Sequence, residues 1–144
     1  MRGFSRRTAA PDGGATSWVR GCALLLALAT PAFADIAVPS GQAVTLSEVL
    51  VDEVGAQNWV RFRFLAPQIA RGAHALSFEE AGADIDALCA QIAVPYLGEW
   101  DLSPDMVVIS LSDRAVPFGQ RDPEATQFFE AYRVEDGTCI WEEL

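Results

Sequence analysis

The chain has 144 residues, with 20 acidic side chains against ten arginines and a formal net charge of −10 at pH 7. A chain of this length has room for one domain with one modest core. Because so acidic a surface repels phosphate backbones and anionic lipids, we expect no nucleic-acid or membrane-surface role, and cations, basic proteins or neutral solutes are the favoured partners.

The N-terminal region has the order of a secretory signal peptide. Four arginines precede an apolar run from Cys22 to Ala29, and the small-residue sequence Ala32-Phe33-Ala34 follows it. The apolar run is much shorter than the ~18 residues that a membrane-spanning helix needs, so we predict a signal peptide over residues 1–34. The Sec and twin-arginine export routes both stay open. The mature protein would keep six arginines and 19 acidic residues, which gives it a formal charge of −13.

The mature chain is expected to begin with an irregular segment and a strand. Residues 35–43 are mostly small and contain Pro39 and Gly41, which favours a short N-terminal arm. A single domain then covers residues 44–144, and its first strand is expected over 44–53.

The next strand is expected over residues 59–65, after a turn that contains Gly55. Here apolar side chains alternate with Arg61 and Arg63, which predicts a half-buried antiparallel strand. Both arginines then lie on the outer face, and the inner face carries Val60, Phe62 and Phe64.

A change to helical periodicity marks residues 77–93. Ser77 and Glu80 have the spacing of a capping box, Asp84 complements the positive end of the helix dipole, and Pro95 is expected to end the helix. Apolar residues at steps of three and four predict one buried stripe, formed by Phe78, Ala81, Ile85, Leu88 and Ile92.

The C-terminal third predicts a buried strand, a loop and a hairpin. Residues 106–111 form a nearly continuous apolar run, which favours a central strand. Residues 113–124 contain two prolines and a glycine and are expected to form a long loop, with or without one helical turn. Asp136-Gly137 predicts a type I′ hairpin turn.

This hairpin predicts a disulfide between Cys89 and Cys139. A two-residue turn pairs Val134 with Cys139 and Tyr132 with Trp141, so all four side chains share one face, and Trp141 is expected in the core. Cys89 lies near the buried stripe of the helix, so a helix packed on this face brings the two sulfur atoms together. Two free thiols and a metal pair are the alternatives. The resulting fold is α+β, with a mostly antiparallel sheet of about five strands and one main helix on one face.

No residue pattern identifies an active site or a cofactor. His74 with Ser110 or Ser112 and Asp113 supplies the residue types of a serine hydrolase without its motif. With 19 acidic residues, some carboxylate pair suits a glycosidase by chance alone, and candidates are Glu99, Asp101, Asp105, Asp113 and Glu124. Asp101, Ser103 and Asp105 begin like a calcium-binding loop that Met106 and Ser112 then break, so no metal site is predicted.

Six residues are candidate contacts for a ligand or partner. Arginine holds anions through bidentate hydrogen bonds, although in so acidic a chain the arginines are also expected to pair with nearby carboxylates. Trp59 and Phe118 are candidate aromatic contacts beside them. The six candidates are Arg61, Arg63, Asp113, Arg114, Phe118 and Arg133.

Most of the mature chain resembles a small exported family of unknown function from rhodobacter-like bacteria. The stretches that carry the resemblance are 60–67, 107–114, 117–119, 124–133 and 135–141. Some members of that family carry an acetolactate synthase label, which the residues here do not support. Such enzymes resemble large thiamine diphosphate proteins with a Gly-Asp-Gly metal motif, whereas this chain is short and has only the hairpin Asp136-Gly137.

The leading functional hypothesis is a periplasmic accessory or binding module that contacts an unknown periplasmic protein or small solute through its surface. The competing hypothesis is a small periplasmic hydrolase that uses carboxylates or His74. The absence of a catalytic motif favours the first.

Overall fold

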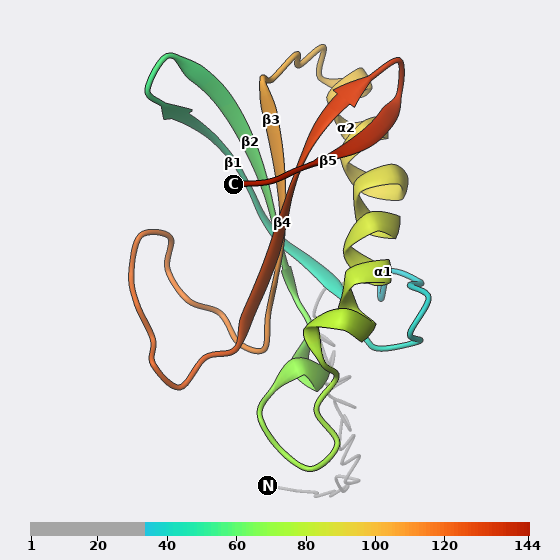
Figure 1. Cartoon of the computed structure of the whole chain (residues 1–144), viewed down its shortest axis with the longest axis vertical. Coiled ribbons are helices and arrows are strands. Elements are labelled where there is room, and N and C mark those ends of the chain that lie inside the picture. The colour runs from blue at the N-terminus through green and yellow to red at the C-terminus, as the bar shows by residue number, and fades with distance from the viewer. Residues whose placement is uncertain (1–33) are drawn as a thin grey trace, which may run out of the picture. The chain divides into compact units, whose positions relative to one another are not determined.

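A computed structural model describes residues 34–144, which form a five-stranded sheet with a long helix on one face (Figure 1). The predicted signal peptide, apart from Ala34, lies outside the described residues. The strands follow the order β1-β2-β3-β4-β5 in the sheet, and they are β1 (Thr45–Val54), β2 (Gln57–Leu65), β3 (Met106–Ser112), β4 (Gln127–Glu135) and β5 (Thr138–Glu142).

The sheet is antiparallel except at one pair of strands. Tight hairpins join β1 to β2 and β4 to β5, while β2 and β3 run parallel because the helical segment crosses between them. The predicted α+β class, with a mostly antiparallel sheet and one main helix, is confirmed. β3 lies at the centre, as its apolar run predicted, and Val107, Ile109 and Leu111 are fully buried.

The helix packs on the inner face of the sheet and closes the core. Alternation in β2 buries Val60, Phe62 and Phe64, as predicted, and the helix contributes Ala81, Ile85 and Leu88 to the same core. Phe78, expected in the buried stripe, is instead 46% exposed. It is the first residue of the helix, beyond the main core, and its ring packs edge-on against Phe128 at 5.4 Å.

The expectation that Pro95 ends the helix is wrong. The helix comprises α1 (Phe78–Leu88), a π-helical turn (Cys89–Ala93) and α2 (Val94–Glu99). In the π turn, the Val94 N–H donates to the Cys89 carbonyl, five residues back. This wider turn moves the preceding carbonyl groups away from the proline ring, which has no N–H of its own, so the helix continues for another turn.

Residues 35–43 are held against the domain. The Ile36 N–H donates to the Val44 carbonyl, and Ser40 donates to the Asp84 carboxylate from its backbone N–H at 2.8 Å and its hydroxyl at 2.6 Å. Gln42 Nε2 donates to the same carboxylate at 2.6 Å. Asp84 is fully buried and anchors this segment, a role that its expected interaction with the helix dipole did not indicate.

The C-terminal hairpin has the predicted register. Glu135 pairs with Thr138, Val134 with Cys139 and Tyr132 with Trp141, and both Asp136 and Gly137 have the positive φ of a type I′ turn. The predicted disulfide between Cys89 and Cys139 is present, with the two Cα atoms 6.3 Å apart.

Trp141 is not in the core, contrary to expectation, because it is 56% exposed. It lies near the end of the edge strand β5, and its Nε1–H donates to the Glu130 carboxylate at 2.6 Å. In the described part of the chain, no helix is both long and apolar enough to cross a membrane.

Candidate functional site

The candidate site begins with the two arginines on the outer face of β2. Strand alternation directs them away from the core, and the hairpin with β1 brings carboxylates beside them. The Arg61 Nε–H donates to Asp52 at 3.0 Å, and the Arg63 Nη1–H donates to Glu48 at 2.6 Å. Both arginine side chains are about four-fifths buried, so these ion pairs fix the two guanidinium groups in place.

Aromatic side chains cover the two arginines. The Arg61 guanidinium carbon lies 5.0 Å from the Trp59 ring centroid, and Phe118 lies 5.5 Å from Arg61 and 5.7 Å from Arg63. These are cation–π distances, and such contacts hold an aromatic ring in one orientation. We call Trp59, Arg61, Arg63 and Phe118 the arginine–aromatic cluster. Phe118 is 50% exposed, so one side of its ring faces solvent.

The loop between β3 and β4 positions Phe118. Two hydrogen bonds between Asp113 and Thr126 join the ends of the loop, at what we call the neck. The Asp113 N–H donates to the Thr126 carbonyl at 3.1 Å, and the Thr126 N–H donates to Asp113 Oδ1 at 2.9 Å. Farther along, the Arg63 Nη2–H donates to the Val116 carbonyl at 2.6 Å. This loop is therefore closed at its neck and tied to β2 at Val116, and it contains no helical turn.

The neck carboxylate is held in its charged form. Burial of Asp113 opposes ionisation, but hydrogen bonds from Arg114 and from the Thr126 N–H, together with the positive charge of Arg114, outweigh it, so the pKa of Asp113 lies below its ordinary value. The Asp113 side chain is only 2% exposed. Its role is to close the loop.

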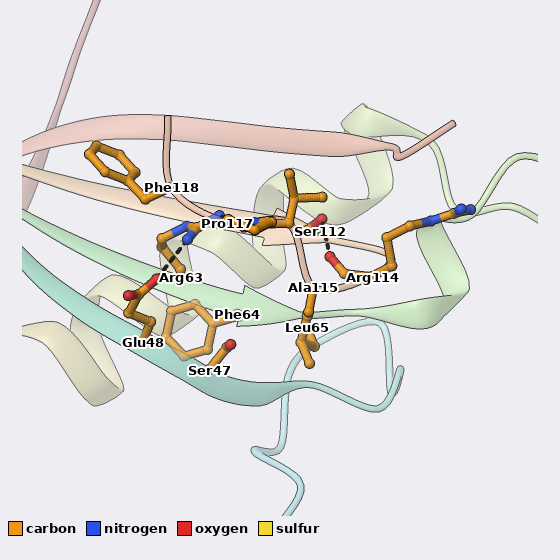
Figure 2. Close-up of a pocket in the computed structure, with 11 residues that line it drawn as sticks. Ser47, Glu48, Arg63, Phe64, Leu65, Ser112, Arg114, Ala115, Pro117 and Phe118 are labelled. Carbon is orange, nitrogen blue, oxygen red and sulfur yellow. Dashed lines mark hydrogen bonds and ion pairs between the residues drawn. The ribbon is translucent and has the colours of Figure 1, made fainter. Parts of the chain in front are cut away.

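A groove of about 490 Å³ lies between this loop, the start of β1 and the end of β2. Figure 2 shows Phe118, Arg63 and Glu48 together at one end of it, while the Arg114 side chain extends away from Arg63 at the other end. Ser47, the extra residue where the register of β1 shifts, contributes to the wall. The groove thus combines an aromatic ring with polar groups that are already paired within the protein.

The structure divides the six predicted contact residues into three places. Arg61, Arg63 and Phe118 meet in the arginine–aromatic cluster, and Asp113 pairs with Arg114 at the loop neck. Arg133 lies on the same face of the sheet but on β4, where it forms ion pairs with Glu135 and Glu142. Arg133 is therefore not part of the arginine–aromatic cluster.

Two residues of the site, Glu48 and Asp52, were not predicted from the sequence. The hairpin pairs Glu48 directly with Arg63 and places Asp52 two residues from Leu50, the partner of Arg61. The two-residue turn at Gly55 could have predicted both positions, because counting residues back from such a turn gives the pairs of residues that face each other across the hairpin.

The residues proposed for hydrolysis do not converge. The Ser112 hydroxyl donates to the Arg114 carbonyl at 2.6 Å, and Asp113 is engaged by Arg114 and Thr126. His74 lies in the loop after β2, where it lines a separate shallow hollow with Gln68. Among residues 34–144, no three histidine, cysteine or acidic side chains are grouped as metal ligands would be.

A second groove, of about 560 Å³, lies beside the disulfide and is lined by Asp86, Tyr132, Cys139 and Trp141. The Tyr132 hydroxyl donates to Asp86 at 2.6 Å. Burial raises the pKa of Tyr132 well above its ordinary range, and the hydrogen bond to Asp86 and the charges of Asp86 and Glu130 raise it further. Tyr132 therefore stays a neutral donor that ties the helix to β4.

Comparison with known proteins identifies the family of this chain but not its function. A search of curated proteins finds no match, and a search of solved structures finds none. One family model matches residues 22–144, which is most of the chain. The chain therefore belongs to a family of unknown function, DUF6497.

Proposed function

We propose that this protein is an exported, periplasmic binding module whose arginine–aromatic cluster contacts a partner protein. One observation carries the proposal: Phe118 is half exposed, yet two arginines that are themselves paired with carboxylates hold its ring. Aromatic residues and arginines are enriched at the centres of protein interfaces, where a rigid ring loses little conformational freedom on binding.

The charges of the cluster favour a protein over a free anion as the partner. Asp52 and Glu48 already neutralise Arg61 and Arg63, so an incoming anion would compete with two fixed carboxylates. An apolar or aromatic side chain that covers the exposed side of Phe118 requires no such competition. The groove next to Phe118 offers space for it.

Three features support the exported location. They are the signal-peptide pattern of residues 1–34, the resemblance to exported proteins of rhodobacter-like bacteria, and the disulfide, which is typical of oxidising compartments. Within residues 34–144, nothing favours a hydrolase that uses His74, because Ser112 and Asp113 are engaged elsewhere and His74 lines a separate hollow.

Co-purification from periplasmic extract tests the proposal. A tagged wild-type domain is expected to retain a discrete protein that the Phe118→Ala variant loses. Trp141→Ala is the matched control, since Trp141 is similarly exposed but lies on the helix face of the sheet. Equal recovery with Phe118→Ala and wild type would contradict the proposal.

A further inference from the structure

β1 forms a long open edge of the sheet. It has ten residues and only one neighbour, β2, whereas the strand at the opposite edge, β5, has five residues (Figure 1). Proteins usually protect such edges with charged residues, proline, a β-bulge or a covering segment, because unpaired backbone groups accept further strands. β1 contains neither lysine nor proline, its register shift at Ser47 lies near its start, and two of its three acidic side chains are paired with arginines.

The register shows which backbone groups of β1 are free. A two-residue turn closes on a hydrogen-bonded pair, here Val54 and Gln57, and hydrogen-bonded pairs then alternate along the hairpin. Asn58 fits this alternation, since its N–H and carbonyl both bond to Asp105 on the side away from β1. Its partner Glu53, together with Val49 and Val51, therefore directs its N–H and carbonyl outward. Within residues 34–144, no hydrogen bond outside the sheet ladder reaches these three residues.

Apolar side chains lie exposed beside this edge. Val51 is opposite the buried Val60, so it belongs to the helix face, yet it is 66% exposed. On the same face, Tyr96 packs edge-on against Phe62 at 5.3 Å, and Trp100, which is 61% exposed, follows at 6.0 Å from Tyr96. The inner face next to β1 therefore offers apolar surface to an added strand.

Charge selects the kind of strand that fits. Four of the six arginines among residues 34–144 form ion pairs, so their positive charges are neutralised. Glu53, by contrast, is exposed near the tip of β1 and forms no ion pair within these residues, so the edge keeps a negative charge there. The predicted mature chain carries a formal charge of −13, so a second copy of it would be repelled. We propose that β1 accepts an extended, basic segment of a partner protein as a sixth strand of the sheet. This site is separate from the arginine–aromatic cluster and does not depend on the function proposed for it.

Three peptides test the pairing against plain charge attraction. The probe is a capped seven-residue peptide that alternates arginine and valine. The first control replaces its central valine with proline, which keeps the charge but removes a donor and breaks the strand. The second control replaces arginine with glutamate. Affinity for the oxidised mature domain is measured by titration, and amide hydrogen exchange is followed by NMR at Val49, Val51 and Glu53.

The arginine–valine peptide is expected to bind at least about tenfold more tightly than either control, because only it supplies both the backbone pairs and the charge. It is also expected to slow exchange at the three outward amides. Equal binding of the proline-containing peptide, no binding of the probe, or unchanged exchange at these amides would each overturn the proposal. Protection of the Val51 amide by self-association of the domain alone would overturn it as well.

A variant of the chain gives a second test. Val51→Pro removes an outward donor that the β1–β2 ladder does not use, and edge strands tolerate proline at such positions. Val51→Thr keeps the donor and the branched shape. We expect probe affinity to fall on the order of tenfold for Val51→Pro and to stay unchanged for Val51→Thr. If Val51→Pro does not fold, the peptide comparison on the wild-type domain decides the question alone.

Discussion

Asp84 and Asp113 show that an acidic residue can be structural in a chain with an excess of acids. Asp84 is fully buried and accepts hydrogen bonds from Ser40 and Gln42, and Asp113 closes the loop that carries Phe118. Most other acidic side chains are exposed. Nothing in the local sequence separates these two residues from the rest, because their partners lie 44 and 13 residues away along the chain.

Replacing Asp84 tests the anchoring of the N-terminal segment. Asp84→Asn keeps the size but leaves fewer acceptors for Ser40 and Gln42, so we expect the free energy of unfolding to fall by about 2 kcal/mol. Urea denaturation measures it. The control is Glu79→Gln, an exposed change in the same helix that is expected to alter stability by less than about 0.5 kcal/mol. Indistinguishable stabilities for the two variants would show that the anchor contributes little.

Asp113 predicts a pH dependence with a definite sign. Because its pKa is lowered in the folded state, its contribution is present above the ordinary aspartate pKa of 3.8 and is lost as the pH falls through the lower folded value. Asp113→Asn is therefore expected to be less stable than wild type at pH 7, by about 1 kcal/mol, and to approach wild type as the pH falls through the lowered pKa of Asp113. Denaturation curves across this range decide it. A difference that stays constant down to the lowest pH would contradict the assignment.

At the scale of elements, short-range patterns in the sequence were reliable, whereas long-range contacts other than the Cys89–Cys139 disulfide were not predicted. Alternation predicted the faces of β2, the capping box predicted the start of α1, and Asp136-Gly137 predicted the hairpin register. The continuation of the helix past Pro95 was not predicted, because a π turn depends on how the helix packs and not on the helix propensities of its residues. The exposure of Trp141 was not predicted either, because alternation gives the face of a strand but not how far the helix covers that face.

The capping box gives a prediction for α1. Both of its hydrogen bonds are present: the Glu80 N–H donates to Ser77 Oγ, and the Ser77 N–H donates to the Glu80 carboxylate. Ser77→Ala removes the first and is expected to lower the free energy of unfolding by about 1 kcal/mol, whereas Ser77→Thr retains most of it. Thermal and urea denaturation of both variants measure the effect. If alanine and threonine are equally tolerated, the cap is not a stabilising element here.

For the whole molecule, the disulfide joins the helix to the last hairpin, and the loop that it closes contains β3 and β4. Cys89 and Cys139 are 50 residues apart, and closing a loop of that length contributes roughly 4 kcal/mol in the chain-entropy model. We expect the Cys89→Ala/Cys139→Ala variant to lose stability on this scale, as measured by urea denaturation beside the oxidised wild type. Equal stability of the two proteins would contradict it.

Intact mass of exported protein is expected to show a chain that begins at Asp35 with both thiols oxidised.

Site-specific photo-crosslinking in cells that produce the protein tests most directly whether the arginine–aromatic cluster contacts a partner. A photoreactive residue is placed at position 118, and in a separate strain at position 91, an exposed site on the helix. A discrete crosslinked protein from position 118 that is absent from position 91 is the predicted result. No crosslink from position 118, or the same products from both positions, would contradict it.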